Sequence, residues 1–274
     1  FIESVTADKK LQAVLAGNNM LYVLQSYKTP FYVHAMILNS YIESSWKCID
    51  GGSAIGKLIA KNIHEQGGVI HRNAEVTKII VEEGKVNSVQ LKDGSHIYGK
   101  TFISNMHPAR TMEFTETNLI KQAYKSRIQG LENSIGGFIL NIVLKKNCYK
   151  YEKHNYYYHK EGQVWSMTDY TEANWPTSYS IFFSASSRSE EYAESITILT
   201  LMKFDEVRKW ENSFNTVSEN EDRGEDYDAF KKHKAETLLD LVEEKFPGLK
   251  DCIKSYYSST PLTYRDYIGN ADGS

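Results

Sequence analysis

The segment with the most specific chemistry is rich in glycine and runs from Gly51 to Leu58. Its first seven residues, Gly-Gly-Ser-Ala-Ile-Gly-Lys, match the phosphate-binding pattern G-x-x-x-x-G-K. The eighth position of that pattern is Ser or Thr, whose hydroxyl holds Mg²⁺, whereas this chain has Leu58. We therefore interpret the segment as a glycine turn that opens a helix. Two adjacent glycines also let the backbone approach a flat ligand closely, because they carry no Cβ.

Metal and nucleophilic chemistry have little support in the sequence. The eight histidines are scattered, and His154 and His159 flank a predicted strand so that they point to opposite faces, which gives no metal site. There is no G-x-S-x-G motif, and neither Cys48 nor Cys148 has a basic neighbour that would mark a nucleophile. His107 is either a loop histidine or a residue that reaches a cleft. The catalytic residues are therefore unknown from these patterns.

Tyrosine is unusually frequent, with 19 residues in the chain. The run from Tyr149 to Tyr158 has two interpretations. Its side chains cover one face of a sheet, or they line an apolar tunnel in which Tyr157 offers its hydroxyl to the polar end of a small molecule.

The composition places the chain among globular proteins. Its 274 residues are 41% hydrophobic, and a net charge of -3 gives no general attraction to nucleic acid or to anionic membranes. The three cysteines are odd in number and far apart, which argues against a disulfide framework and favours a reducing, cytoplasmic compartment. No apolar run reaches the roughly 20 residues that span a bilayer.

The elements that would position these residues can be read from the hydrophobic pattern. We expect helices over the first forty-odd residues with a break at Pro30, and then an amphipathic helix with Ser53 as N-cap and Gly67 as its end. Hairpin turns are expected at Glu83-Gly84 and at Asp93-Gly94, the latter as a type I′ turn. Further helices are predicted at 118–130 and 230–246, and strands at 69–72, 76–83, 86–91, 101–105, 135–145, 149–158, 179–185, 196–204 and 255–259. Strands of this spacing with few crossover helices predict an α+β fold with an antiparallel-rich mixed sheet.

The order of these elements, together with short motifs, resembles a known family. The motif residues are the Gly51-Gly52 turn, the Gly67-Gly68 stop, Ala74, Val76 and Ile79 in the pattern A-x-V-x-x-I, and the strand 101–105 before Pro108. This block, 49–108, resembles the middle of FAD-dependent oxidoreductases of the phytoene-desaturase, carotenoid-isomerase and retinol-saturase group, a layout shared with amine oxidases. Downstream, 170–176 and 261–267 look like the retinol-saturase branch.

The resemblance implies an organisation and candidate residues. Residues 1–45 would be a helical part of the substrate domain, 46–110 part of a Rossmann-like FAD-binding layer, and 111–274 the substrate domain with the antiparallel sheet and the long helix. The candidate residues are Glu75, Val76, Asn105, Gly51, Gly52 and Ser53 for FAD, and Tyr264, Arg265 and Tyr157 for the substrate.

Departures from the family pattern shape the expected function. No G-x-G-x-x-G occurs, so the usual pyrophosphate cradle is missing, and the chain opens at Phe1 without a methionine. We expect an internal fragment that is inactive and does not retain FAD by itself. The whole protein would act on carbon–carbon double bonds of a long apolar polyene. A flavin amine oxidase and a non-catalytic module that binds prenylated proteins stay open as alternatives. Peripheral membrane contact is compatible with the resemblance, and no oligomeric state is indicated.

Overall fold

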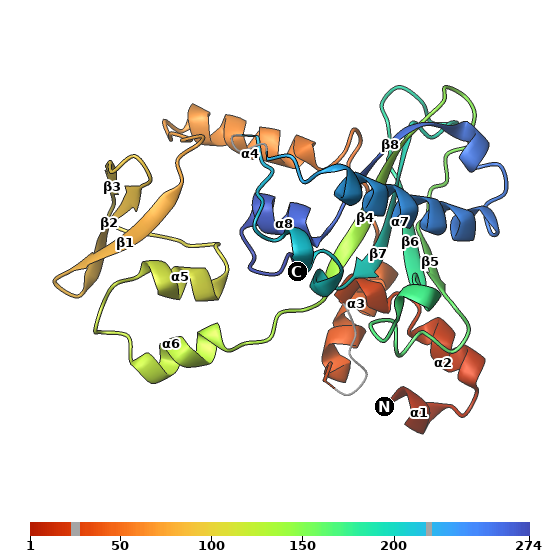
Figure 1. Ribbon diagram of the computed structural model, residues 1–274, viewed down its shortest axis with the longest axis horizontal. Coiled ribbons are helices and arrows are strands. Elements are labelled where there is room, and N and C mark those ends of the chain that lie inside the picture. Colours follow the sequence, from red (N-terminus) through yellow and green to blue (C-terminus); the bar gives the residue numbers. More distant parts are fainter. Residues whose placement is uncertain (23–27, 218–220) are drawn as a thin grey trace. The chain divides into compact units, whose positions relative to one another are not determined.

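The computed structural model describes residues 1–22, 28–217 and 221–274. These residues form two compact units (Figure 1). The larger unit combines Phe1–Gly56 with Ser134–Ser274, and the smaller unit is Lys57–Asn133.

The larger unit is built on a five-stranded sheet with the order β5-β6-β7-β4-β8 (Figure 1). Its strands are β4 (Gly136–Leu144), β5 (Tyr156–His159), β6 (Ser178–Phe183), β7 (Ser195–Met202) and β8 (Ile253–Ser259). Every neighbouring pair is antiparallel. The predicted α+β fold with an antiparallel sheet is therefore confirmed.

The core of this unit lies between the sheet and one long helix, α7 (Glu225–Glu243). In β4, buried and more exposed residues alternate, so that Phe138, Leu140 and Ile142 all point into the core. Helix α7 meets them with Leu238 and Val242, which repeat at helical spacing and are fully buried. Each such side chain stabilises the fold by about 1.5–3 kcal/mol.

The N-terminal part is helical, as predicted. It contains α1 (Ile2–Val5), α2 (Lys9–Leu15), the 3-10 helix η1 (Asn19–Tyr22) and α3 (Phe31–Glu43). Pro30 is the N-cap of α3, where a fixed φ and the missing N–H are tolerated. The intervening residues 23–27 lie outside the described part of the chain.

The smaller unit contains a three-stranded antiparallel sheet and two short helices. The strands are β1 (Val76–Glu82), β2 (Lys85–Leu91) and β3 (His96–Tyr98), and the helices are α5 (Pro108–Phe114) and α6 (Gln122–Gln129). Helix α4 (Ser53–Glu65) precedes them and has Ser53 as its first residue.

The two hairpin turns occur where they were predicted, but the type I′ geometry predicted for Asp93-Gly94 is wrong, and it is found at Glu83-Gly84 instead. Glu83 and Gly84 have φ values of 48° and 80°, as a type I′ turn requires. At the second turn only Gly94 has a positive φ, because the Asp93 carboxylate accepts a hydrogen bond from the Ser95 N–H at 2.9 Å and fixes a different turn.

Two predicted strands are wrong. Residues 69–72 and 101–105 have no strand structure, and their apolar side chains Val69 and Ile103 are 73% and 94% exposed. A strand needs a partner for its backbone groups, and the described residues supply none for these segments. The predicted helix 118–130 and the predicted strand 149–158 are both realised only in their later parts, as α6 and β5.

The remaining elements are short. They are the 3-10 helices η2 (Glu172–Asn174), η3 (Phe204–Glu206), η4 (Arg208–Trp210) and η5 (Lys250–Cys252), and the helix α8 (Pro261–Ile268). Within the described ranges, no helix has the length and hydrophobicity that crossing a membrane would require.

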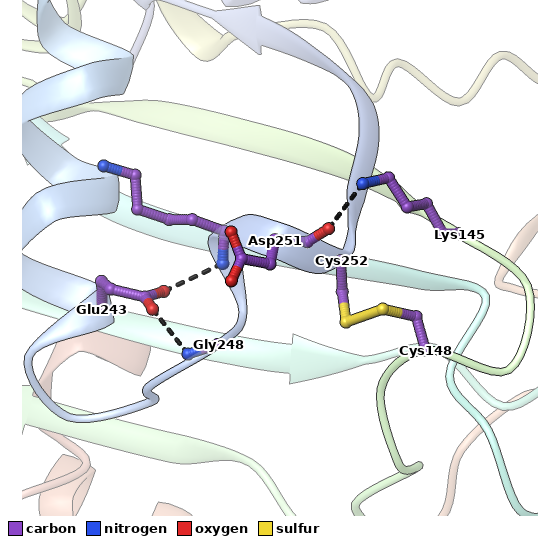
Figure 2. Close-up of a disulfide and its surroundings, with 7 residues drawn as sticks. Lys145, Cys148, Glu243, Gly248, Asp251 and Cys252 are labelled. Atoms are coloured by element: carbon purple, nitrogen blue, oxygen red, sulfur yellow. Dashed lines mark hydrogen bonds between the residues drawn. A yellow bond between two sulfur atoms is a disulfide. The ribbon is translucent and has the colours of Figure 1, made fainter.

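The expectation that the cysteines form no disulfide is also wrong. Cys148 and Cys252 are bonded, with their Cα atoms 5.5 Å apart (Figure 2). The pairing follows from the sheet, because antiparallel β4 and β8 place Leu144 opposite Ile253 and so bring the two cysteines together. The Lys145 Nζ also donates to the Asp251 carbonyl at 2.6 Å. Since disulfides are typical of oxidising compartments, the cysteines no longer support a reducing, cytoplasmic one.

Candidate functional site

A cavity of about 500 Å³ in the larger unit contains Tyr157, one of the predicted substrate residues. It is bounded by the C-terminal end of α3, the loop that follows α3, and the residues that lead into β5. Its lining residues are Ser40, Tyr41, Ser44, Ser45, Trp46, Lys47, Lys153, His154, Asn155 and Tyr157. The volume lies within the usual range for small-molecule sites.

Two tyrosine hydroxyls meet in this cavity. The Tyr41 and Tyr157 oxygens are 3.2 Å apart, although the residues are 116 positions apart in the sequence. Burial, with a further contribution from the hydrogen bond to Tyr41, raises the pKa of Tyr157 well above its ordinary value. Tyr157 therefore acts as a neutral hydrogen-bonding group at physiological pH.

Basic side chains also line the cavity. The Lys47 Nζ donates to the Phe183 carbonyl at 3.2 Å and lies 5.6 Å from the centre of the Tyr151 ring. Burial lowers the pKa of Lys47, because its charged form loses hydration. His154 precedes β5, so it does not share a strand with His159 as the opposite-face prediction assumed. Its Nε2 lies 2.8 Å from the Tyr156 hydroxyl.

The glycine turn begins a few residues after Lys47. Asp50 and Gly51 have φ values of 61° and 88°, a left-handed geometry that glycine adopts most easily. The turn is fixed to the segment between β6 and β7, because the Asp50 N–H donates to the Ala185 carbonyl and the Asp50 carboxylate accepts from the Ser187 N–H, both at 2.9 Å. Hydrogen bonds from the backbone and the side chain of Ser187 hold the pKa of Asp50 below its usual value.

The backbone of this turn is open. A Cβ placed at Gly51 or Gly52 would have no atom within 4 Å. Ser53 then begins α4 as its first helical residue, whereas the sequence suggested an N-cap. An open backbone at the start of a 13-residue helix presents N–H groups and carries no side chain that would hinder a ligand.

The other predicted cofactor residues belong to the smaller unit. The Glu75 carbonyl accepts from the Lys92 N–H at 2.9 Å, and its exposed carboxylate pairs with the Lys92 ammonium at 3.1 Å. Val76 opens β1, which is an edge strand of its three-stranded sheet and pairs there with Leu91. Asn105 is exposed in the segment that was predicted to be a strand.

The predicted substrate residues do not come together. Tyr157 is on β5, whereas Tyr264 and Arg265 are on α8, which directly follows β8. Strands β5 and β8 are the two opposite edges of the sheet, and four strand spacings amount to about 19 Å. These residues therefore form two separate sites.

Arg265 is used inside the protein. Its guanidinium donates to the Glu211 and Ser213 carbonyls and, at 2.8 Å, to the fully buried carboxylate of Asp266. Its neighbour Tyr264 is half-buried, and burial raises the pKa of Tyr264 to about 12. The geometry gives Arg265 a role in anchoring α8 to the chain around η4.

Other residues in the quoted motifs also have structural roles. The Tyr170 hydroxyl donates to Glu206 at 2.5 Å, and the buried Lys234 ammonium contacts the same carboxylate at 2.7 Å. Lys234 lies 4.5 Å from the centre of the Trp175 ring. In the smaller unit, the Nδ1 of His107 accepts from the Ala109 N–H at 3.2 Å, so this histidine caps α5.

Sequence reasoning missed several residues of the Tyr157 cavity. Tyr41, Lys47 and Asn155 were not singled out, because their neighbours in sequence form no motif. Only the pairing of distant segments places Tyr41 beside Tyr157. The frequency of tyrosine was the one available signal, and it did not distinguish Tyr41 from the other tyrosines.

Comparison with known proteins identifies similar sequences. No family model matches the chain. All-trans-retinol 13,14-reductase of Danio rerio is 22% identical over 99% of this chain and 47% of its own length. Prolycopene isomerase of Daucus carota is 26% identical over 91% of this chain and 39% of its own length. A neurosporene-forming phytoene desaturase of Rhodobacter capsulatus is 36% identical over 30% of this chain and 17% of its own length.

The chain thus spans about half the length of the curated relatives that it matches along its whole extent. These relatives all carry names of carotenoid or retinoid desaturases, isomerases and reductases. The resemblance drawn from the motifs is confirmed.

Proposed function

We propose, from this kinship with carotenoid and retinoid desaturases, isomerases and reductases, that the chain is the substrate-side segment of an FAD-dependent oxidoreductase. The reaction of the whole protein takes place at a carbon–carbon double bond of a long apolar polyene. The observation that carries the proposal is the match over 99% of this chain to a retinol reductase. The open glycine turn close in sequence to a cavity-lining lysine supports it.

The larger unit offers features that fit a flat cofactor. Gly51 and Gly52 leave their backbone uncovered, and the bonds from Asp50 to the segment before β7 hold the turn in place. A ligand can therefore contact main-chain N–H groups at the start of α4 without displacing a side chain. We assign Gly51, Gly52 and Ser53 to the flavin side of the cofactor.

The smaller unit has an unpaired backbone edge of its own. Val76 lies on an edge strand, so one side of its backbone does not pair with β2. Edge N–H and C=O groups can bind the rim of a purine in the same way as they bind another strand. We assign Glu75 and Val76 to the adenine side of FAD. We assign Asn105 to the same FAD-binding layer, without a contact to a particular part of the cofactor.

These assignments separate the role of the cofactor from the role of the chain. FAD, when bound, supplies the transfer of hydride equivalents, and this chain binds and orients the polyene and excludes water. The Tyr41–Tyr157 hydroxyl pair orients a polar group of the substrate by hydrogen bonds. Because G-x-G-x-x-G is absent from this sequence, the chain alone holds FAD weakly and is inactive.

Two measurements test the proposal. The chain is incubated with FAD, desalted and examined by visible absorption, and a colourless protein is expected. The full-length product of the gene is then treated in the same way and assayed by chromatography with all-trans-retinol, prolycopene and phytoene. Retained flavin and conversion of one polyene are expected.

A full-length protein that retains no flavin would contradict the assignment. A matched Gly51→Val variant should lose flavin, because valine adds a branched side chain to an open, left-handed backbone position. The variant Gly162→Val, at an exposed turn residue with φ 75°, serves as a control for strain alone.

A further inference from the structure

The cavity around Tyr157 has an unbalanced charge. Lys47 and Lys153 line it, and none of its lining residues is acidic. The nearby Glu152 carboxylate lies 3.5 Å from the His154 Nε2, and burial together with this carboxylate raises the pKa of Tyr156, so Glu152 is directed toward those two side chains. The cavity therefore presents cationic groups without an internal counterion.

Lys47 is the more buried of the two cations. Its ammonium contacts the neutral carbonyl of Phe183 and lies over the ring of Tyr151, and no carboxylate of the described residues lies within ion-pair distance. A partly desolvated ammonium without a carboxylate is costly, and an anion from outside would offset that cost.

Neutral donors complete the arrangement. In the Tyr41–Tyr157 pair one O–H is used between the two oxygens, which leaves the other O–H to donate to a ligand. The Ser44 Oγ accepts from the Trp46 Nε1 at 2.6 Å, so its own O–H is also left to donate. Hydrogen bonds from such groups to an anion are among the stronger ones in proteins.

Two further lining residues indicate which chemical groups the ligand would carry besides its negative charge. Trp46 is 91% exposed and offers an aromatic surface to an apolar chain. The Asn155 Oδ1 is buried and has no donor in the described part of the chain. That oxygen can accept a hydrogen bond from a protonated ligand oxygen, which the monoanion of a phosphate monoester carries and a carboxylate lacks.

We propose that this cavity is an anion-binding subsite for the phosphate or carboxylate end group of an amphiphile whose apolar part lies against Trp46. Lys47 and the tyrosine pair bind the anion, and Asn155 favours a protonated phosphate. This proposal rests on the proposed function in one respect only: that function implies that the apolar part of the amphiphile is long.

Binding can be measured on this chain without flavin. Octyl phosphate, octanoate and octanol are titrated by calorimetry and by tryptophan fluorescence. We expect saturable binding of both anions, with octyl phosphate at least as tight as octanoate, and octanol weaker by about tenfold or more. Raising the salt concentration should weaken the binding of the two anions and leave the affinity for octanol unchanged. Because no flavin is present, this result does not depend on whether the chain belongs to a flavoenzyme.

Variants identify the residues responsible. Lys47→Gln keeps a donor for the Phe183 carbonyl but removes the charge. This variant should bind both anions about tenfold more weakly. Lys146→Gln, at an exposed position after β4, is the matched control and should change nothing. Tyr157→Phe provides a second test if Lys47→Gln does not fold, and it should weaken anion binding by about fivefold.

Three results would overturn the subsite. They are the absence of saturable anion binding, octanol binding as tightly as octanoate, and wild-type anion affinity in both Lys47→Gln and Tyr157→Phe. A Trp46→Phe variant that keeps the calorimetric signal and loses the fluorescence change would place the apolar part as proposed.

Discussion

Breaking the disulfide between Cys148 and Cys252 should destabilise the larger unit strongly. The bond closes a loop of 104 residues, so it restricts the unfolded chain much more than a local cross-link would. In the loop-entropy description, such a loop contributes about 4.7 kcal/mol to the free energy of unfolding at 25 °C. For a domain of this size, that corresponds to a melting temperature lower by about 10 to 20 °C.

The assay is equilibrium unfolding in urea, followed by circular dichroism, with and without dithiothreitol. Cys148→Ser removes the bond with little cost in packing, because Cys148 is exposed whereas Cys252 is only 6% exposed. Cys48→Ser is the matched control, since Cys48 is exposed and has a free thiol. Reduction should also increase the dependence of stability on urea, because the unfolded chain then exposes more surface.

The reasoning would be refuted if reduced protein and Cys148→Ser each lost less than about 1 kcal/mol relative to the oxidised wild type. An equal loss in Cys48→Ser would show that the effect arises from thiol chemistry in general and not from the cross-link.

Three further predictions concern buried groups. Lys234→Met leaves the Glu206 carboxylate without its ammonium partner, and urea unfolding should show a loss of about 3–5 kcal/mol; a loss below 1 kcal/mol would contradict a buried ion pair. Burial lowers the pKa of His159 below its ordinary 6.5, so the folded state binds fewer protons than the unfolded state, and stability should be complete above pH 6.5 and fall below it. His159→Gln should remove part of that decrease, and an unchanged pH profile would exclude His159 as its source. Gly273→Ala would place a Cβ 1.8 Å from the Pro261 carbonyl oxygen, so a markedly lower melting temperature is expected, and wild-type thermal stability would show that the chain end does not pack there.

Local sequence predicted the elements whose geometry depends on near neighbours. The Glu83-Gly84 turn, the strand beginning near Gly136 and the long helix α7 all follow from turn residues or from a regular apolar period. The family resemblance was also readable from short motifs. The assignments of Glu75, Val76, Asn105 and the glycine turn to FAD stay predictions, since their test needs the cofactor.

Local sequence failed where an element depends on partners from elsewhere. Residues 69–72 and 101–105 have the apolar, β-branched character of strands, yet no described strand pairs with them. Propensity describes how a side chain fits a sheet, and it cannot supply the neighbouring backbone.

By itself, the sequence determined the periodic elements, the turn positions and the family likeness, because each depends on residues a few positions apart. Tertiary structure alone decided that Cys148 meets Cys252, that Tyr41 meets Tyr157, and that β5, which carries Tyr157, and β8, which leads into the helix of Arg265, are opposite edges of one sheet. The physical reason is that strand order and register set these distances. Strand order arises from how the whole core packs, and no short segment contains that information.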